Sequence, residues 1–379
     1  MSGSGSGQSV REDGHPVAED LLGRLLIEIC QTPAPTFEEE RRAALVTRMW
    51  REAGLEPTSD GVGNVVAEVP GGEGPRVLLA AHLDTVFSAE VDVTVRRQGT
   101  RWSAPGIGDN SASLALLTYL LRERRSAGLR LPRITAAATV GEEGLGDLRG
   151  ARSLVEERGD EFDFVVAIDG HLSTIVDVAV GSKRFRVELT AQGGHSWGDF
   201  PAPSAVHALG AMVASLEALK VSRQPRSSYN IGQVWGGTGV NAIAQRAGFN
   251  LDLRSVDSSA LDELERDALA RFHKAARRHR VDVTIEKVGD RPAATVDNRR
   301  LVSMAQEALA AVSIEGGAAA SSTDANVAMA AGIPAIAFGV YAGGDAHRMS
   351  EWLERPSLEV GYRALTGLLA RLAGEPGQE

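Results

Sequence analysis

The feature that most constrains the fold of this chain is a series of short apolar runs that end abruptly in acidic or histidine residues. Three runs, over residues 77–81, 134–140 and 164–168, have the length of buried strands. Helix-like stretches separate them, and this alternation predicts a mostly parallel sheet with helices on its faces. Sheets of this kind place ligand sites just outside the carboxyl ends of their strands. The residues directly after the runs are therefore the candidates for a functional site.

Hydrophobic periodicity divides much of the chain into helices and strands. In the first part we expect helices over residues 17–33, 37–53, 111–126 and 149–158. We expect strands there over residues 63–69, 76–81, 133–140 and 164–168. The same β/α style returns after Pro292, with helices expected over residues 298–312, 324–331 and 356–373 and a strand over residues 334–340.

The pattern between these two parts is different. Lys183 to Thr190 alternates polar and apolar residues, as a half-exposed antiparallel strand does. A helix, two strands, a helix and a strand are expected next, over residues 203–219, 229–235, 247–254, 258–279 and 281–287. This β-α-β-β-α-β order is ferredoxin-like. We therefore predict a flexible leader, a discontinuous catalytic α/β domain and an inserted α+β domain. The leader covers residues 1–16, the catalytic domain covers residues 17–180 and 293–379, and the inserted domain covers residues 181–292.

Composition and charge limit the partners and the location. The net charge of −10 argues against a nucleic-acid partner, which usually leaves a basic face. No apolar stretch reaches the roughly 18 residues of a membrane span, and the leader lacks the apolar segment of a signal peptide. The single cysteine, Cys30, lies among leucines and isoleucines and is expected to be buried. We expect a cytoplasmic protein without a membrane partner.

Two candidate clusters follow strands or loops early in the sequence. His82 and Asp84 are two residues apart at a strand end, where side chains at this spacing point the same way. His82 could bind a metal through one ring nitrogen while Asp84 holds the other nitrogen. A strand-end histidine and a turn-capping aspartate fit the same pair. Asp109 lies in a glycine-rich loop before a helix, where it could bridge two metals or simply cap the helix.

Glu142 and Glu143 form the most informative pair. They follow a predicted buried strand after a single glycine, and a second glycine comes directly after them. Adjacent carboxylates repel each other when both are buried without compensation. A metal cation would resolve the conflict by taking one carboxylate as a ligand, and the other could then act as a general base. Two solvated acids in a loop are the alternative.

Two later clusters complete the set. Asp169 directly follows the run over residues 164–168 and is a candidate ligand, with His171 as a nearby competitor. His347 lies in a glycine-rich loop, where an isolated histidine is usually a surface residue. Imidazole and carboxylate are typical ligands of a catalytic zinc, and cobalt and manganese accept them too. The clusters together predict two divalent metal ions, with Zn²⁺ as the first choice.

The clusters, in this order, resemble the motifs of the M20 family of dinuclear-zinc peptidases and amidohydrolases. The matching stretches are Ala81–Val86, Gly108–Ser111, Gly141–Gly144, Gly193–Ser196, Ser322–Asn326 and Gly344–His347. The resemblance covers nearly the whole chain. It implies that a water activated by two metals hydrolyses an amide or peptide bond in a small substrate. The substrate would be a dipeptide, a tripeptide or an N-acyl amino acid.

Position by position, the resemblance implies two ligand groups that share one carboxylate. The ligands would be His82, Asp109 and Asp169 for one metal and Asp109, Glu143 and His347 for the other. Glu142 would be the general base, and Asp84 would orient the ring of His82. An aspartate at the position of Asp169 is typical of the aminopeptidases and dipeptidases of the family, which favours those activities.

The resemblance also assigns roles to the inserted domain. This domain would act as a lid and form a homodimer, and His195 would stabilise the oxyanion in an active site, commonly that of the partner subunit. Asn241 and Arg254 match lid positions that contact substrate. Asn326 is a further candidate for substrate contact, as is Trp197, where many relatives carry a small residue.

Three other functions fit parts of the sequence. Gly194–Gly198 matches the nucleophile elbow of serine hydrolases, with Ser196, Asp324 and His347 in the required chain order. This assignment leaves the paired glutamates without a role, and the strand before the serine alternates instead of being fully apolar. An amidohydrolase or deaminase for a small non-peptide compound and a non-catalytic metal-binding protein are the other two. Nucleotide-binding glycine motifs are absent from the sequence.

Overall fold

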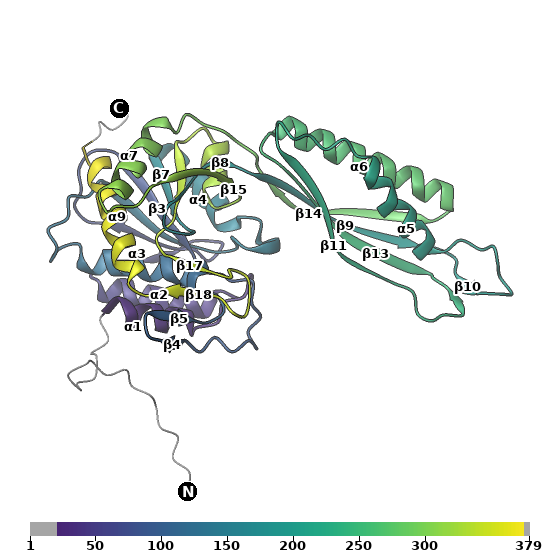
Figure 1. Ribbon diagram of the computed structural model, residues 1–379, viewed down its shortest axis with the longest axis horizontal. Helices are drawn as coiled ribbons and strands as arrows, with labels where there is room; N and C mark the ends of the chain where they lie inside the picture. The colour runs from purple at the N-terminus through teal and green to yellow at the C-terminus, as the bar shows by residue number, and fades with distance from the viewer. Residues whose placement is uncertain (1–20, 375–379) are drawn as a thin grey trace, which may run out of the picture.

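The computed structural model describes residues 21–374, which form a large α/β unit and a longer, narrower α+β unit (Figure 1). The larger unit is built on an eight-stranded sheet in the order β1-β2-β6-β3-β7-β16-β8-β15. These strands are β1 (Thr58–Ser59), β2 (Val65–Val69), β3 (Arg76–His82), β6 (Arg133–Thr139), β7 (Phe164–Ile168), β8 (Thr174–Ala179), β15 (Gly317–Ser321) and β16 (Ala335–Phe338). In the centre, β3 pairs in parallel with β6 and β7, and β7 pairs in parallel with β16.

Both faces of this sheet are covered, so its central strands are buried at nearly every position. Leu79 and Leu78 are successive residues of β3 and point into different cores, since side chains alternate along a strand. The helices that pack on the first core are α1 (Leu21–Cys30), α2 (Glu40–Glu52), α3 (Ser113–Glu123), α7 (Arg299–Ala310) and α9 (Ser357–Leu372). The helices on the second are α4 (Arg149–Arg158) and α8 (Ala325–Ala330). Double coverage explains the near-continuous apolar runs.

A small antiparallel sheet brings a late loop to the carboxyl end of the large sheet. Its strands are β4 (Arg96–Gln98), β5 (Arg101–Ser103), β17 (Gly343–Gly344) and β18 (Trp352–Glu354). The β17–β18 connection contains His347, and β5 precedes the helical turn over Ile107–Ala112 that contains Asp109. The pairing of β5 with β18 therefore ties together two loops that are more than 200 positions apart in the sequence.

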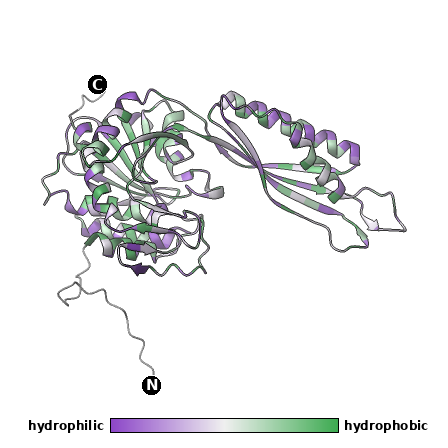
Figure 2. Cartoon of the chain, in the orientation of Figure 1, coloured by the Kyte–Doolittle hydropathy of each residue, from purple (hydrophilic) through white to green (hydrophobic). Residues whose placement is uncertain are grey.

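The second unit is an antiparallel sheet covered on one face by helices. Its strands are β9 (Gly181–Thr190), β11 (Ser227–Gly236), β13 (Arg246–Ser255) and β14 (Asp282–Arg291), in the order β11-β13-β9-β14. The helices are α5 (Ala205–Ser215) and α6 (Ser258–His279), and α6 is amphipathic, with its polar side facing outward (Figure 2). A short two-stranded antiparallel sheet of β10 (Gly194–His195) and β12 (Ala242–Ile243) lies at the end of the unit remote from the large sheet (Figure 1).

The predicted fold class, a sheet flanked by helices with an inserted ferredoxin-like unit, is confirmed. The large sheet is mixed, because β2 and β16 also make antiparallel pairs with β6 and β8. Strands β8 and β15 were not among the elements expected from the sequence. Cys30 is buried, as expected, and its burial raises the pKa of the thiol to about 12. The leader over residues 1–16 lies outside the described residues.

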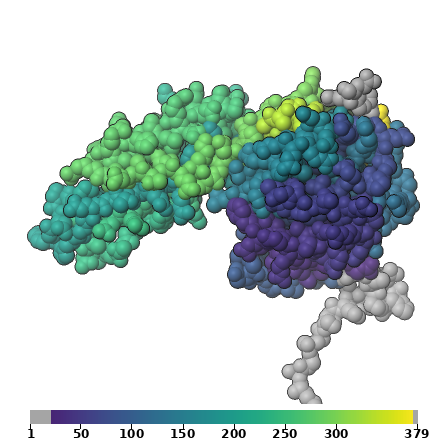
Figure 3. All heavy atoms as spheres, turned by 180° about the vertical axis from the view of Figure 1, so that it is seen from behind, coloured from purple at the N-terminus to yellow at the C-terminus, as the bar shows by residue number. Residues whose placement is uncertain are grey.

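The chain passes between the two units twice, and we call these two connections the crossings. Seen from behind, the second unit projects from the first (Figure 3). Asn326 at the start of α8 ties both crossings together. Its Nδ2 donates to the carbonyl oxygens of Val180 and Pro292 at 2.9 and 3.1 Å, and its Oδ1 accepts the N–H of Thr323 at 3.0 Å. The side chain is fully buried. The prediction that Asn326 contacts substrate was therefore wrong, because its amide is used on the backbone.

Among residues 21–374, none of the helices has both the length and the apolar character that a membrane crossing needs.

Candidate metal centre

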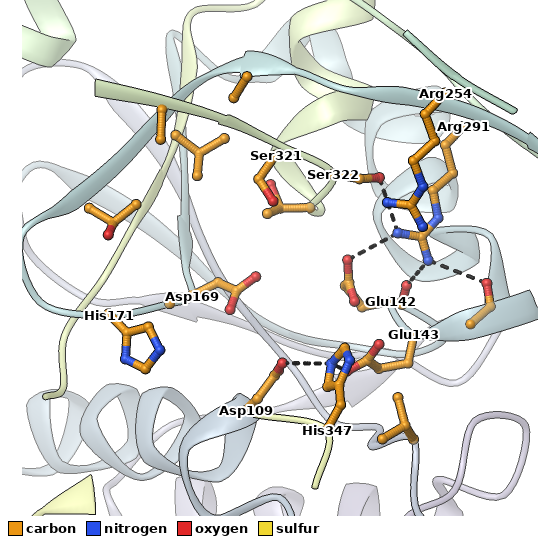
Figure 4. A pocket seen from close by; sticks show the side chains of 18 of the residues that line it. Asp109, Glu142, Glu143, Asp169, His171, Arg254, Arg291, Ser321, Ser322 and His347 are labelled. Carbon is orange, nitrogen blue, oxygen red and sulfur yellow. Dashed lines mark hydrogen bonds and ion pairs between the residues drawn. The ribbon is translucent and has the colours of Figure 1, made fainter. Parts of the chain in front are cut away.

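The predicted ligands converge at the carboxyl end of the large sheet, and Figure 4 shows four of them, Asp109, Glu143, Asp169 and His347. His82 ends β3, the two glutamates follow β6, and Asp169 follows β7. Asp109 comes from the helical turn before α3, and His347 comes from the loop between β17 and β18. The carboxyl ends of parallel strands lie together at one end of the sheet. Residues that follow these strands therefore meet here, although they are far apart in the sequence.

Asp109 lies at the centre of the cluster. Its Oδ1 is 3.1 Å from Nε2 of His82, and its Oδ2 is 3.0 Å from Nε2 of His347. The same Nε2 of His347 is 2.9 Å from Oε1 of Glu143. Two groups of potential ligand atoms each lie within 4.8 Å of one another and share Asp109. They are His82, Asp109 and Asp169, and Asp109, Glu143 and His347.

The polar atoms of the cluster fit a pair of cations. Nε2 of His82 and Oδ1 of Asp109 are buried, and neither makes a hydrogen bond despite their short separation. A buried nitrogen and a buried oxygen without hydrogen bonds cost free energy that a shared cation would recover. Nitrogen and oxygen ligands of this kind suit zinc, cobalt and manganese. The donor set therefore supports two divalent metal ions.

The charges of the cluster are strongly coupled. Burial alone would raise the pKa of Asp109, but the neighbouring imidazoles of His347 and His82 lower it below the usual range of an aspartate. Burial, together with the charge of Asp109, raises the pKa of Asp169 to about 7. Hydrogen bonds to Asp109 and Glu143 raise the pKa of His347 to about 11. In the metal-free protein, protonated imidazole thus provides part of the positive charge that the carboxylates need.

Asp84 holds more of the site than the sequence indicated. Nδ1 of His82 lies 3.1 Å from the carbonyl oxygen of Asp84 and 3.6 Å from its Oδ1. The carboxylate of Asp84 also accepts the backbone N–H groups of Glu142 and Glu143 at 3.0 and 2.9 Å. One buried aspartate therefore contacts the imidazole and also fixes the backbone of both glutamates.

Glu351 is a supporting residue that sequence reasoning missed. Its carboxylate, almost fully buried, accepts the backbone N–H groups of Gly106, Gly108 and Asp109 at 2.8–2.9 Å. These bonds fix the turn that presents Asp109. Burial raises the pKa of Glu351 to about 7. A glutamate four residues after His347, in the same loop, was the only sequence signal for this role.

Glu142 lies beside the cluster and is paired with an arginine. Nη1 of Arg291 is 3.4 Å from Oε1 of Glu142, and Nη2 donates to the carbonyl oxygen of Glu142. A third ligand grouping, His82 with Glu142 and Glu143, is also geometrically possible. We favour the two groupings that share Asp109, because the carboxylate of Glu142 already forms an ion pair with Arg291.

The cluster opens into a cavity of about 640 Å³ between the two units. Residues of β15 form one wall, and its side chains are small, which explains why this strand carried no clear apolar pattern in the sequence. Arg254, predicted to contact substrate, lines the cavity. His171, the competitor of Asp169, also lines it but packs on the ring of Tyr341 and belongs to none of the ligand groupings.

Four residues named from the sequence lie in the second unit, away from this cavity. These residues, which lie on or next to the short β10–β12 sheet at the remote end of the second unit (Figure 1), are His195, Ser196, Trp197 and Asn241. His347, in contrast, lies in the metal cluster. Ser196 and His347 of one chain are thus held far apart, and the serine-hydrolase triad is not formed within the chain.

The fold and the cluster define an α/β protein with a dinuclear metal site and an inserted α+β unit. The sequence matches the description "Peptidase family M20/M25/M40" over residues 78–371. This match extends over most of the chain, and the protein therefore belongs to that family.

Curated relatives and solved structures agree with this membership. A protein of Pyrococcus abyssi named as a LysW-lysine/LysW-ornithine hydrolase is 31% identical over 167 residues, which are 44% of each chain. The match thus spans about half the length of that relative. A tripeptidase of Staphylococcus aureus has a TM-score of 0.79 at 22% identity, covering 94% of this chain and 98% of its own. A dinuclear metal-binding M20 peptidase of Bacillus subtilis has a TM-score of 0.66 at 17% identity, covering 93% and 98%.

Metal binding is expected to release protons. The pKa of His347 is about 11 in the metal-free site, so a metal ion must displace a proton from this imidazole at neutral pH. Metal affinity should therefore increase with pH throughout the range below that pKa. Calorimetric titration of metal-free protein with ZnCl₂, in buffers of different ionisation enthalpy, should give buffer-dependent heats. His273→Ala, on the exposed side of α6, is the control and should behave like the wild type. Heats that do not depend on the buffer would contradict this description.

Proposed function

We propose that this protein hydrolyses an amide bond in a dipeptide, a tripeptide or an N-acyl amino acid. The observation that carries the proposal is the shared carboxylate of Asp109, whose two oxygens face the ring nitrogens of His82 and His347 at 3.1 and 3.0 Å. Paired metals in hydrolytic enzymes sit about 3.5–4 Å apart, a spacing that a bridging carboxylate suits. Cations bound here, with Zn²⁺ as the first choice, would polarise the scissile carbonyl and lower the pKa of a water.

The relatives support amide hydrolysis without naming the substrate of this chain. The named activities include a LysW-lysine/LysW-ornithine hydrolase and a tripeptidase. We favour an aminopeptidase or a dipeptidase, because Asp169 stands where such members of the family carry aspartate. His82, Asp109 and Asp169 would hold one metal, and Asp109, Glu143 and His347 would hold the other.

Glu142 is the general base in this proposal. Its carboxylate lines the cavity beside the ligands, and burial raises its pKa well above that of an exposed glutamate, although Arg291 opposes the shift. A carboxylate with a raised pKa can both take up and return a proton near neutral pH. Glu142 would remove a proton from water while the water oxygen bonds to the carbonyl carbon. The same proton would pass to the nitrogen as the C–N bond breaks.

His195 is suited to donate a hydrogen bond to the oxyanion. Its Nδ1 accepts the backbone N–H groups of Trp197 and Gly198, both at 3.2 Å, so the ring proton resides on Nε2. The ring is exposed and lies away from the cavity of its own chain. We propose a homodimer formed by the second unit, in which His195 of the partner subunit completes the site.

Side chains near His195 support this arrangement. Exposed apolar side chains lie near this histidine: Trp197 is 88% exposed, Phe200 75% and Val240 103%. Such exposure is unusual for large apolar residues, and an interface would bury them. The backbone carbonyl oxygen of Asn241 accepts the N–H of Ser196 at 3.0 Å, so Asn241 lies beside the segment that contains His195. We propose that Trp197 and Asn241 contact substrate only across the dimer.

Replacement of Glu142 tests the proposed function. We expect Glu142→Ala and Glu142→Gln to lower kcat by about 10²- to 10⁴-fold, the usual contribution of a positioned base. Both variants should keep two metals per chain by elemental analysis, because Glu142 belongs to neither grouping that shares Asp109. Ser321→Ala, on the cavity wall, is the control and should retain activity. Substrates would be screened among dipeptides, tripeptides and N-acyl amino acids. An active Glu142→Ala enzyme would remove the assignment.

Mixed dimers test the position of His195. Glu142→Ala and His195→Ala chains should each be inactive alone. When they are co-expressed, a mixed dimer contains one intact site if His195 acts in the partner subunit, and random pairing restores about a quarter of the wild-type activity. The double variant Glu142→Ala/His195→Ala, paired with itself, is the control and should stay inactive. Failure of the mixture to regain activity would show that His195 does not act across the dimer.

A further inference from the structure

One wall of the cavity is rich in guanidinium groups. Arg184 of β9, Arg254 of β13 and Arg291 at the end of β14 all line it. Figure 4 shows Arg254 and Arg291 next to each other, across the cavity from Asp109. All three arginines come from the second unit, whereas the acidic cluster comes from the first. Of these three arginines, only Arg254 was predicted from the sequence to contact substrate.

Strand register explains why Arg184 and Arg254 are close. Asp252 of β13 lies directly opposite Arg184 of β9, and Arg254 follows two residues later on the same face of the sheet. Nε of Arg184 is 3.3 Å from Oδ1 of Asp252, and Nε of Arg254 is 2.7 Å from Oδ2. A single carboxylate therefore holds two guanidinium groups through their Nε atoms.

The outer nitrogens of these arginines are largely available. Within residues 21–374, the Nη atoms of Arg254 have no hydrogen-bond or ion-pair partner. Nη1 of Arg184 donates to the carbonyl oxygen of Gly144, and Nη2 has no partner within the same residues. Arg291, in contrast, is committed to Glu142 and Ser322. Arg184 and Arg254 thus offer free donors to the same cavity.

The charge of the cavity favours an anionic substrate. Four carboxylates line it, and two divalent cations would offset all four. The three guanidinium groups then outnumber the one remaining carboxylate that contacts them, Asp252. Burial and the nearby charge of Arg291 lower the pKa of Arg184, which shows that these positive charges repel one another. A bound anion would relieve this repulsion, and guanidinium is well suited to bind carboxylate.

We infer that Arg184 and Arg254 form an anion subsite that selects amides whose leaving amino acid carries a second carboxylate, as glutamate and aspartate do. The resemblance to the family already implies that Arg254 contacts the substrate, often at its carboxylate. The new element is Arg184, which provides a donor for the second carboxylate. The inference rests on the proposed amide hydrolysis for its first test and is independent of it for its second.

The first test compares two substrates that differ only in side-chain charge. Wild-type, metal-loaded enzyme should have a kcat/KM for Ala-Glu at least about 10-fold higher than for Ala-Gln, because charge-assisted hydrogen bonds are worth roughly this factor. Arg184→Met should reduce this ratio to about 1, and Arg184→Lys should keep part of it. Arg186→Met, two residues along β9 and outside the cavity, is the control and should keep the full ratio.

The second test measures binding without turnover. Calorimetry should show that glutamate binds the metal-loaded enzyme at least about 10-fold more tightly than glutamine, and that Arg184→Met but not Arg186→Met removes the difference. Selective glutamate binding without turnover of any amide would support the subsite and refute the proposed hydrolysis. Amide turnover with equal rates for Ala-Glu and Ala-Gln would overturn the subsite and leave the hydrolysis intact. The wild-type comparison decides the matter even if Arg184→Met fails to fold.

Discussion

The structure of the site depends on the repulsion among the carboxylates that the fold brings together at the carboxyl end of the large sheet. Asp109, Glu142, Glu143 and Asp169 line one cavity, and such groups are stable together as anions only when positive charge lies between them. In the metal-free chain, His347 and Arg291 provide part of that charge through contacts with Asp109, Glu143 and Glu142. Two metal ions shared by Asp109 would provide it in full.

The supporting contacts act before any metal binds. Glu351 fixes the turn of Asp109 through three backbone N–H groups, and Asp84 fixes the backbone of both glutamates. Both carboxylates are almost fully buried and do not line the cavity. The ligands are thus held by hydrogen bonds from neighbouring loops, so metal binding need not order the loops themselves. Pre-organisation of this kind is what a precise two-metal geometry requires.

The cavity joins two units with complementary chemistry. The large sheet contributes the acidic cluster, and the second unit contributes Arg184, Arg254 and Arg291. The two crossings at Val180 and Pro292, which Asn326 ties together, set how these walls face each other. In the proposed function, metal binding and substrate recognition are therefore separated between the units, although both would act on the same cavity.

The sequence predicted the fold class and most elements, because apolar runs and helical periodicity reflect burial directly. His82, Glu143 and Asp169 could be expected to meet because the strand ends of a parallel sheet converge, whereas Asp109 and His347 lie in loops and were included only because the motifs occur together. It missed β15, whose glycine and alanine side chains carry no apolar signal, and Glu351, whose role depends on a loop contact distant in sequence. It placed Asn326 at the substrate, because a motif does not reveal that an amide is used by the backbone. The proximity of Arg184 to Arg254 depends on strand register, which the sequence left open.

The most direct test of the central claim is a crystal structure of the zinc-loaded protein with anomalous data collected at the zinc absorption edge. We expect two anomalous peaks about 3.5–4 Å apart, one on each side of Asp109. The first should lie within bonding distance of His82 and Asp169, and the second within bonding distance of Glu143 and His347. A single peak, or peaks that do not contact Asp109, would contradict the account.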